Sequence, residues 1–147
     1  MYTLYIPNMT ELPLENISTI GQGARFSVIR EQGRLKAYQY LWSDLTVLLT
    51  LMPPEELGDH LKGLFGFLTK ISRNLDLPPP RDLMEQIKKT TLVLGCVAKP
   101  DVDAQGRAEN IIGAICYNTD SVMFHGAAFY NRSSERVFPP PNSPPSR

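Results

Sequence analysis

Only a few residues in this sequence are of the types that catalysis or metal binding uses. The two histidines are His60 and His125, and histidine is the usual general base of enzymes. No G-x-S-x-G or other nucleophile motif accompanies them, and neither belongs to a C-x-x-C or H-E-x-x-H pattern. The sequence therefore predicts no catalytic residue, no metal and no cofactor. His60, Phe67 and His125 remain candidates to line a pocket.

Two short stretches resemble parts of ligand-binding loops. Gly21-Gln22-Gly23 resembles the start of a phosphate loop, but such a loop follows a strand and opens a helix, whereas here a strand pattern follows. The stretch from Asp101 to Gly106 matches the first half of a calcium loop, with alternate carboxylates and a glycine at the bend. However, Ile112 stands where the closing acid should be. We interpret both stretches as turns.

Three aromatic residues, Tyr38, Tyr40 and Trp42, alternate along one predicted strand. Alternate residues of a strand share a face, and we expect the aliphatic residues of this region to point the other way, toward the helices. Tyrosine and tryptophan are frequent where one end of a side chain is dry and the other wet, as at partner surfaces. This face is therefore predicted to bind a protein partner or a second copy of the chain. Two alternatives remain: the aromatics stabilise cross-strand pairs, or the segment 7–20 covers them.

Composition argues against several classes of partner. The chain has 147 residues, which suits one domain of common size. Its 15 basic and 15 acidic residues cancel, so it lacks the net positive charge that favours nucleic acid or an anionic membrane. Cys96 and Cys116 are expected to be reduced core thiols. With no signal-peptide pattern and no apolar run near the ~20 residues of a membrane span, we expect a cytoplasmic protein that binds neither nucleic acid nor membrane.

The first half of the chain predicts an antiparallel three-stranded meander followed by amphipathic helices. Met1–Ile6 is expected to be an edge strand. From Ala24 to Met52 apolar residues alternate in three runs, which is the period of half-buried strands. Pro54–Ser72 carries leucines at helical spacing, after prolines and acids that suit a helix start. A shorter helix is expected over Arg81–Thr90.

The second half is organised around Leu92–Ala98, an uncharged apolar run. A run this short and rich in β-branched residues is typical of a strand buried on both faces. A helix over Arg107–Tyr117 and a strand over Val122–Tyr130 follow, which predicts a C-terminal β-α-β unit with its two strands parallel. The fold class is therefore α+β, with a single domain over residues 1–138. The proline-rich residues 139–147 are expected to form a disordered tail.

Two functional hypotheses from different classes follow. The preferred one is a non-enzymatic cytoplasmic protein-interaction module, such as an adaptor or an inhibitor or immunity-type protein, because no motif for catalysis, nucleotides or metals stands out. The alternative is a small enzyme or ligand-binding domain, with a pocket between the sheet and the helices that uses His60 or His125. Active-site residues are often scattered along a chain, so the lack of a motif does not exclude it. A structural subunit of a larger assembly is a third hypothesis.

Overall fold

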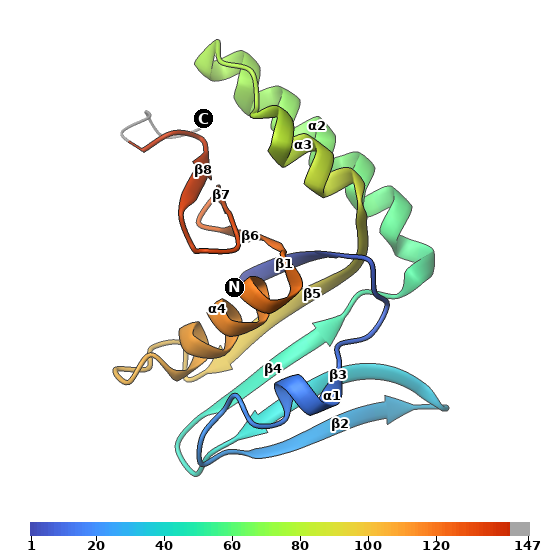
Figure 1. Cartoon of the computed structure of the whole chain (residues 1–147), viewed down its shortest axis with the longest axis vertical. Coiled ribbons are helices and arrows are strands. Elements are labelled where there is room, and N and C mark those ends of the chain that lie inside the picture. Colours follow the sequence, from blue (N-terminus) through green and yellow to red (C-terminus); the bar gives the residue numbers. More distant parts are fainter. Residues whose placement is uncertain (142–147) are drawn as a thin grey trace.

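The computed structural model describes residues 1–141, and the eight strands in this range form one antiparallel sheet (Figure 1). Along the sheet the order is β2-β3-β4-β5-β1-β6-β7-β8. The strands are β1 (Tyr2–Pro7), β2 (Arg25–Glu31), β3 (Arg34–Leu41), β4 (Thr46–Leu51), β5 (Thr90–Lys99), β6 (Val122–His125), β7 (Ala128–Tyr130) and β8 (Arg136–Phe138). The helices are α1 (Leu14–Ile17), the 3-10 helix η1 (Pro54–Glu56), α2 (Leu57–Leu75), α3 (Arg81–Lys88) and α4 (Arg107–Thr119). The predicted α+β class is confirmed.

Strand β1 lies in the middle of the sheet, so the expectation that it forms an edge is wrong. It pairs with β5 on one side and with β6 on the other, and Leu4 is opposite both Leu94 and Met123. Leu4, Tyr5 and Ile6 are consecutive and all buried. A continuous buried run is what a strand needs when both faces of the sheet are covered.

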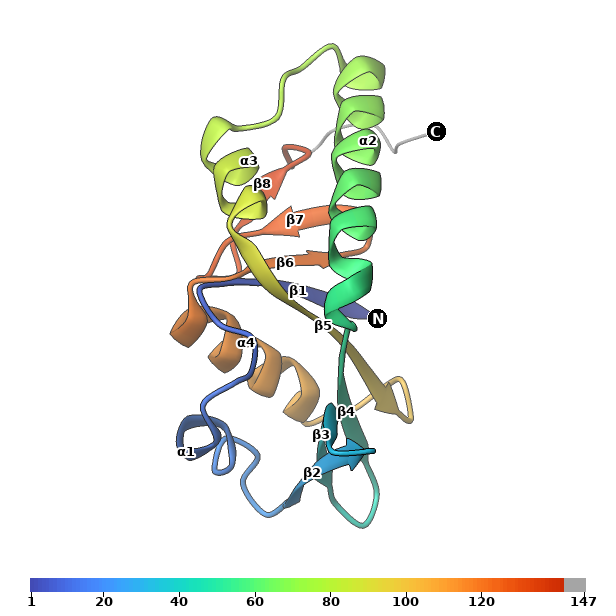
Figure 2. The same ribbon diagram turned by 90° about the vertical axis from the view of Figure 1, so that its right-hand side faces the viewer.

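Strand β1 and residues 92–94 of β5 are covered on both faces. On one face Leu4 and Leu94 belong to a core cluster with Ile111 and its neighbours on α4. On the other face Tyr5 and Val93 belong to a second cluster with residues of α2 and α3. Figure 2 shows α4 and the pair α2 and α3 on opposite sides of these strands. The strand predicted at Leu92–Ala98 is present and is interior, because β5 is paired on both edges. Burial on both faces holds only for residues 92–94, whereas Gly95 and Val97 are half-buried.

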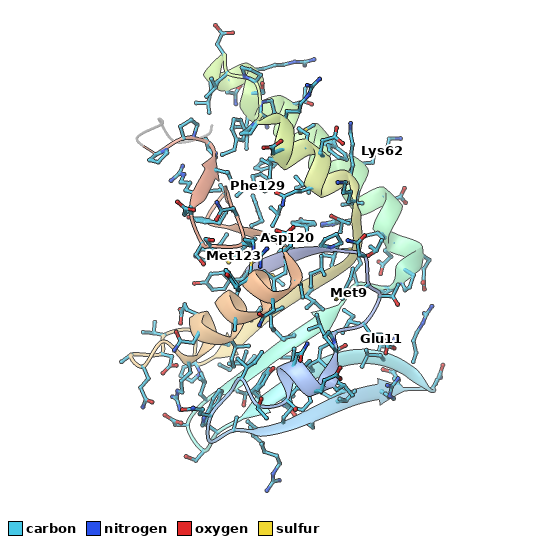
Figure 3. The ribbon with its side chains drawn as sticks, viewed as in Figure 1. Met9, Glu11, Lys62, Asp120, Met123 and Phe129 are labelled. Carbon is cyan, nitrogen blue, oxygen red and sulfur yellow. The ribbon has the colours of Figure 1, made fainter. Side chains whose placement is uncertain are left out.

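Strands β5 and β6 do not pair with each other, because β1 lies between them. Each is antiparallel to β1, so the two run parallel with one strand inserted. The strand predicted over Val122–Tyr130 is instead a hairpin of β6 and β7, whose buried side chains include Met123 and Phe129 (Figure 3). Gly126 and Ala127 both have positive φ, at 57° and 59°, as a two-residue hairpin turn requires. The uninterrupted apolar sequence hides this turn.

A β-bulge decides which side chains of β3 face which way. Glu31 pairs with Arg34 across a two-residue turn, but beyond the bulge Val28 pairs with Tyr38. The extra residue on β3 is Lys36, which has no partner in the register. Residues directly opposite each other share a face, so the bulge moves Tyr38 and the alternate residues after it to the side of Val28. Without it, Ala37 would be opposite Val28, which is the arrangement expected from the alternating sequence.

The helices differ from expectation mainly at their ends. Helix α2 continues to Leu75 and stops at Asp76, whose φ of 51° is left-handed. Helix α4 extends to Thr119. None of the helices within residues 1–141 is long and apolar enough to cross a membrane.

The chain packs against the domain slightly beyond the predicted end of the domain at residue 138. Pro139 is buried, and Arg136 Nε donates a hydrogen bond to its carbonyl oxygen at 2.7 Å. The remaining part of the predicted tail, residues 142–147, lies outside the described residues.

Candidate functional site

One face of strands β2–β4 is closed by the segment 8–23, which we name the N-terminal strap. Tyr38 Oη accepts a hydrogen bond from the backbone N–H of Leu12 at 2.8 Å. Tyr40 Oη donates one to the carbonyl oxygen of Ile17 at 2.6 Å. Trp42 Nε1 donates one to the carbonyl oxygen of Gln22 at 2.9 Å. Three aromatic side chains, each with a polar tip, therefore hold the strap in place.

The strap changes the interpretation of this aromatic face as a partner-binding surface. Tyr38 and Tyr40 have no solvent exposure at all, and Trp42 is half-buried. Burial raises the pKa of the Tyr40 hydroxyl above its ordinary value, so the group stays neutral and keeps its donor. A docking partner could not reach either tyrosine, because the bulge places both side chains on the aliphatic, covered side of the sheet. The structure has the alternative arrangement, in which the N-terminal segment covers them.

The opposite side of β2–β5, which we name the open face, has no comparable cover. The register places its residues in three rows across the four strands. These rows are Arg25, Leu41, Thr46 and Lys99; Ser27, Gln39, Leu48 and Val97; and Ile29, Ala37, Thr50 and Gly95.

Four of the five apolar side chains of the open face are exposed or half-buried, whereas the fifth, Ala37, is buried. Ile29 and Leu41 are 38% and 39% exposed, and Leu48 and Val97 are half-buried. None of the four belongs to either core cluster. In Figure 2, helix α2 rises away from β4 and leaves this side of β2, β3 and β4 without a helix. The structure therefore contains a sheet face without a helix on it, where apolar side chains from four strands lie among polar ones.

The charges of the open face have one sign. Arg25 and Lys99 stand at the two ends of the first row, and both are exposed. Among residues 1–141 neither takes part in an ion pair. No carboxylate occurs in the three rows. A neutral chain thus presents a locally positive apolar surface.

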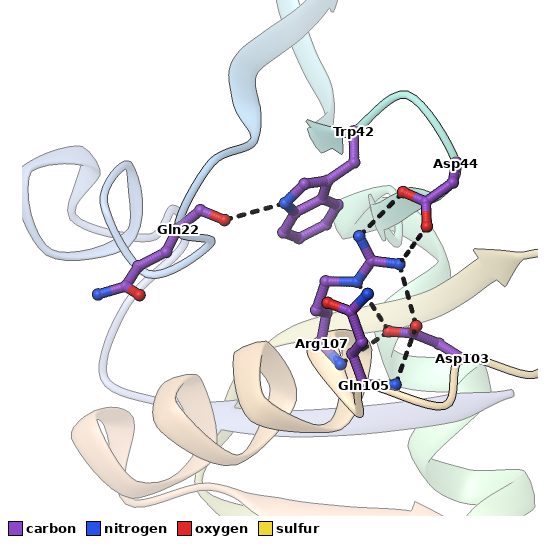
Figure 4. A network of polar contacts seen from close by, with 6 residues as sticks. All are labelled: Gln22, Trp42, Asp44, Asp103, Gln105 and Arg107. Atoms are coloured by element: carbon purple, nitrogen blue, oxygen red, sulfur yellow. Dashed lines mark hydrogen bonds and ion pairs between the residues drawn. The ribbon is translucent and has the colours of Figure 1, made fainter.

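A second polar cluster ties the turn after β3 to the start of α4 (Figure 4). Arg107 donates to both oxygens of Asp44, at 3.0 and 2.8 Å, and to both oxygens of Asp103, at 3.1 and 3.0 Å. Its guanidinium also lies over the Trp42 ring, 5.0 Å from the centroid. Such paired, fork-shaped contacts are strong and directional. The cluster therefore fixes Trp42, and with it the strap, relative to α4.

Electrostatics of this cluster favour a structural role. The hydrogen bonds from Arg107 lower the pKa of Asp103 to about 2 and also lower the pKa of Asp44. Asp103 has a side chain only 6% exposed, and it accepts a further bond from the backbone N–H of Arg107 at 2.8 Å. Because two carboxylates already neutralise the one guanidinium, Arg107 has no free charge with which to bind an anion.

The two stretches that resemble ligand-binding loops take part in these contacts, through Gln22 and Asp103. Gly21 to Gly23 line an open hollow of about 540 Å³ with Trp42 and Arg107. A Cβ atom at Gly21 would lie 2.7 Å from Cδ1 of Tyr40, and Gly23 has a φ of 81°, so both glycines serve the close approach of the strap. Among residues 1–141 no group of three or more acidic, histidine or cysteine side chains is placed to hold a metal ion.

The pocket candidates do not form one site. His60 Nε2 lies 2.9 Å from Tyr5 Oη, and burial raises the pKa of that phenol to about 12. Phe67 contacts Phe124 edge to face. His125 Nδ1 lies 3.1 Å from the carbonyl oxygen of Met1, and its ring stacks on Tyr2. Each side chain has its own local partner.

Comparison with known proteins places this chain in no family. No family model matches it, and neither a curated protein nor a solved structure matches it.

The sequence does not reveal the open face, because strict alternation along β3 places Ala37, Gln39 and Leu41 on the aliphatic side of the sheet, which is expected to face the helices. One signal was present: Gln39 is polar in the middle of that set, whereas Tyr38 and Tyr40 on the other set can bury their rings and bond through their tips. Polarity at the centre of a strand is better evidence of a solvent face than the presence of aromatic residues.

Proposed function

We propose that this chain acts by binding another protein through the open face of β2–β5. The observation that carries the proposal is that Ile29 and Leu41 are exposed and Leu48 and Val97 half-buried on a sheet face without a helix on it (Figure 2). Four strands spaced about 4.8 Å apart, over about five residues each, give a face on the order of 300 Å². Apolar side chains occupy part of this area, and exposed apolar side chains that gather on one face are often functional.

The charges of the face indicate the chemistry of the partner. Arg25 and Lys99 are exposed cations without ion partners among residues 1–141. A partner that presents an apolar surface bordered by carboxylates would match both the centre and the edge, and charge matching favours correct encounters and suppresses wrong ones. A second copy of this chain would bring a further pair of cations and no carboxylate to the same face.

The cytoplasmic compartment remains part of this proposal. Cys96 and Cys116 are both free and buried, and burial raises the pKa of the Cys96 thiol to about 12. Thiols that stay protonated and buried are unreactive, and free cysteines are usual in a reducing compartment.

The alternative of an enzyme that uses His60 or His125 has less support. A general base needs access to a substrate proton. His60 is engaged with Tyr5 Oη and His125 with the main chain at Met1, and neither lines the hollow between the strap and α4.

A photo-crosslinking experiment tests the proposal. A photoreactive benzoyl-phenylalanine is placed at Leu41 on the open face and, as the matched control, at Thr69 on the exposed side of α2. After irradiation in the cell of origin, we expect a discrete adduct from position 41 and none of the same mass from position 69. The protein in the adduct is then identified and purified.

Direct binding of the purified partner gives the decisive result. We expect Leu41→Asp to abolish binding and Arg25→Glu with Lys99→Glu to weaken it, at an unchanged melting temperature. Equal adducts from both positions, an adduct of this chain with itself, or unchanged binding by Leu41→Asp would each contradict the proposal.

A further inference from the structure

A separate hollow of about 230 Å³ lies where β3 and β4 part. The two strands pair as far as Ala37 and Thr50. Beyond this pair the bulge at Lys36 turns β3 away. The chain from Thr10 to Glu11 and the start of η1 and α2 close the space between the separated strands. The hollow is thus a consequence of the same bulge that reorients the aromatic residues.

The walls of this hollow are mostly apolar. Six aliphatic or proline side chains come from β3, from the end of β4 and from the turn into α2, and two more come from β5. They are Leu35, Leu51, Met52, Pro53, Pro54, Leu57, Leu92 and Val93. For comparison, an engineered apolar cavity of about 150 Å³ binds benzene.

Two cations border the hollow, and only one of them is available. Arg34 forms a two-pronged ion pair with Glu55, at 3.1 Å for each contact. Lys36 is half-buried, and among residues 1–141 it has no ion pair or side-chain hydrogen bond. The pKa of Glu55 is lowered by a backbone hydrogen bond, by Arg34 and also by Lys36, so Lys36 interacts with this carboxylate without contacting it. Because Glu55 is exposed and bonded to Arg34, the ammonium of Lys36 can still contact the anion of a ligand directly.

We infer that this hollow binds a small carboxylate with an apolar body, such as a short-chain or aromatic monocarboxylate. The apolar part fills the space between the separated strands, and the carboxylate accepts hydrogen bonds from the ammonium of Lys36. This site is independent of the open face, because its lining residues belong to none of the three rows that define that face.

Glu11 modulates the site. This residue of the strap also lines the hollow and is exposed, at the position labelled in Figure 3. Its carboxylate repels an anionic ligand, although water screens the repulsion at an exposed position. Removing the charge of Lys36 should therefore weaken the binding of an anion, and removing the charge of Glu11 should strengthen it.

Hexanoate and hexan-1-ol are the probes for the test, because they share an alkyl chain and differ in charge. Each is titrated into the full chain at constant ionic strength, and amide chemical shifts are followed by NMR. We expect hexanoate to shift the amides of Leu35, Leu51 and Leu57. Lys36→Met should weaken hexanoate about tenfold, as the loss of a charge-assisted contact predicts, and leave hexan-1-ol unchanged. Glu11→Gln should tighten hexanoate.

Lys62→Met is the matched control, since Lys62 is an exposed lysine on α2 away from the hollow. It should leave hexanoate binding unchanged. The inference is overturned if hexanoate shifts no amide around the hollow, if Lys36→Met and Lys62→Met weaken binding equally, or if hexan-1-ol loses affinity in parallel with hexanoate. The melting temperature of each variant, measured first, separates these results from unfolding.

Discussion

The two faces of strands β2–β4 are formed by alternate residues of the same strands, yet one face is covered and the other is not. On the strap side, Tyr38 and Tyr40 are fully buried and their hydroxyls bond the strap backbone. On the open side, Leu41 is 39% exposed and Gln39 is half-buried, and only the small Ala37 is buried. The difference arises from one extra residue, Lys36, at the bulge.

This comparison shows that hydrophobicity alone does not assign a face. Leucine on the open face is more apolar than tyrosine on the strap side, but tyrosine can bury a large ring and still satisfy its hydroxyl. The covering segment supplies the partners for those hydroxyls. The faces of β2–β4 differ both in what packs on them and in composition, because the strap-side rows that span all three strands carry only apolar and aromatic residues, whereas the open side also carries Arg25, Ser27 and Gln39.

The largest predicted effect contrasts two positions on β5. Leu94 is fully buried, so Leu94→Asp places an unpaired charge in the core and should unfold the protein, a loss above about 4 kcal/mol. Val97 lies on the open face and is half-buried, so Val97→Asp should leave a folded protein with reduced stability. Urea denaturation followed by circular dichroism measures both. A fully unfolded Val97→Asp variant would mean that the open face is packed.

A second contrast uses adjacent residues of β3. Tyr40→Ala removes a large buried ring and should reduce the free energy of unfolding by about 3–5 kcal/mol, as for other large aromatic residues in cores. Leu41→Ala, on the other face, should cost less than about 1 kcal/mol, because exposed positions are tolerant. Similar costs for the two variants would contradict the assignment of the faces.

Removing one hydroxyl sharpens the same comparison. Tyr40→Phe keeps the ring but leaves the carbonyl oxygen of Ile17 with only the long 3.4 Å bond from the backbone N–H of Ile20, which should cost about 1–3 kcal/mol. Hydrogen exchange of the strap amides should also become faster, since the strap would open more easily. If exchange accelerates equally at α3, the hydroxyl does not act through the strap.

The smallest effect is a pH dependence at the Arg107 cluster. The pKa of Asp103 is lowered to about 2 from an ordinary value of 3.8, so the folded state favours the ionised carboxyl. Its contribution to stability is complete above about pH 5 and is lost as the pH falls through 3.8 toward 2. Asp103→Asn should flatten this part of the stability profile. If the free energy of unfolding of this variant falls equally steeply at acid pH, the pH dependence comes from other carboxyl groups.

The sequence predicted most elements because their periods are strong. The apolar stripe of α2, the buried run of β5 and the alternation of β2 each reflect packing that any arrangement of this chain would need. The hairpin at Gly126 could not be predicted from period, because small apolar residues continue through the turn. Helix α1 is only four residues long, too short to show a period.

The candidate site could not be predicted from the sequence because a bulge has no reliable sequence signal. One inserted residue shifts every later side chain of β3 to the other face. The central place of β1 also depends on pairing between Tyr2–Pro7 and strands far along the chain, which local patterns do not contain. The aromatic residues stand out in the sequence, but their hydrogen-bond partners are backbone groups of Leu12, Ile17 and Gln22, which no side-chain pattern can indicate.

The most direct test of the open face compares two cysteine substitutions in the presence of the protein captured through position 41. Leu41→Cys lies on the open face, and Val47→Cys lies on the strap side, where Val47 is fully buried; the native thiols are themselves buried. We predict that a thiol reagent labels Leu41→Cys quickly in the free protein and slowly in the complex, and labels Val47→Cys slowly in both. An equal labelling rate for Leu41→Cys with and without the partner would contradict the proposal that the open face is where this chain binds.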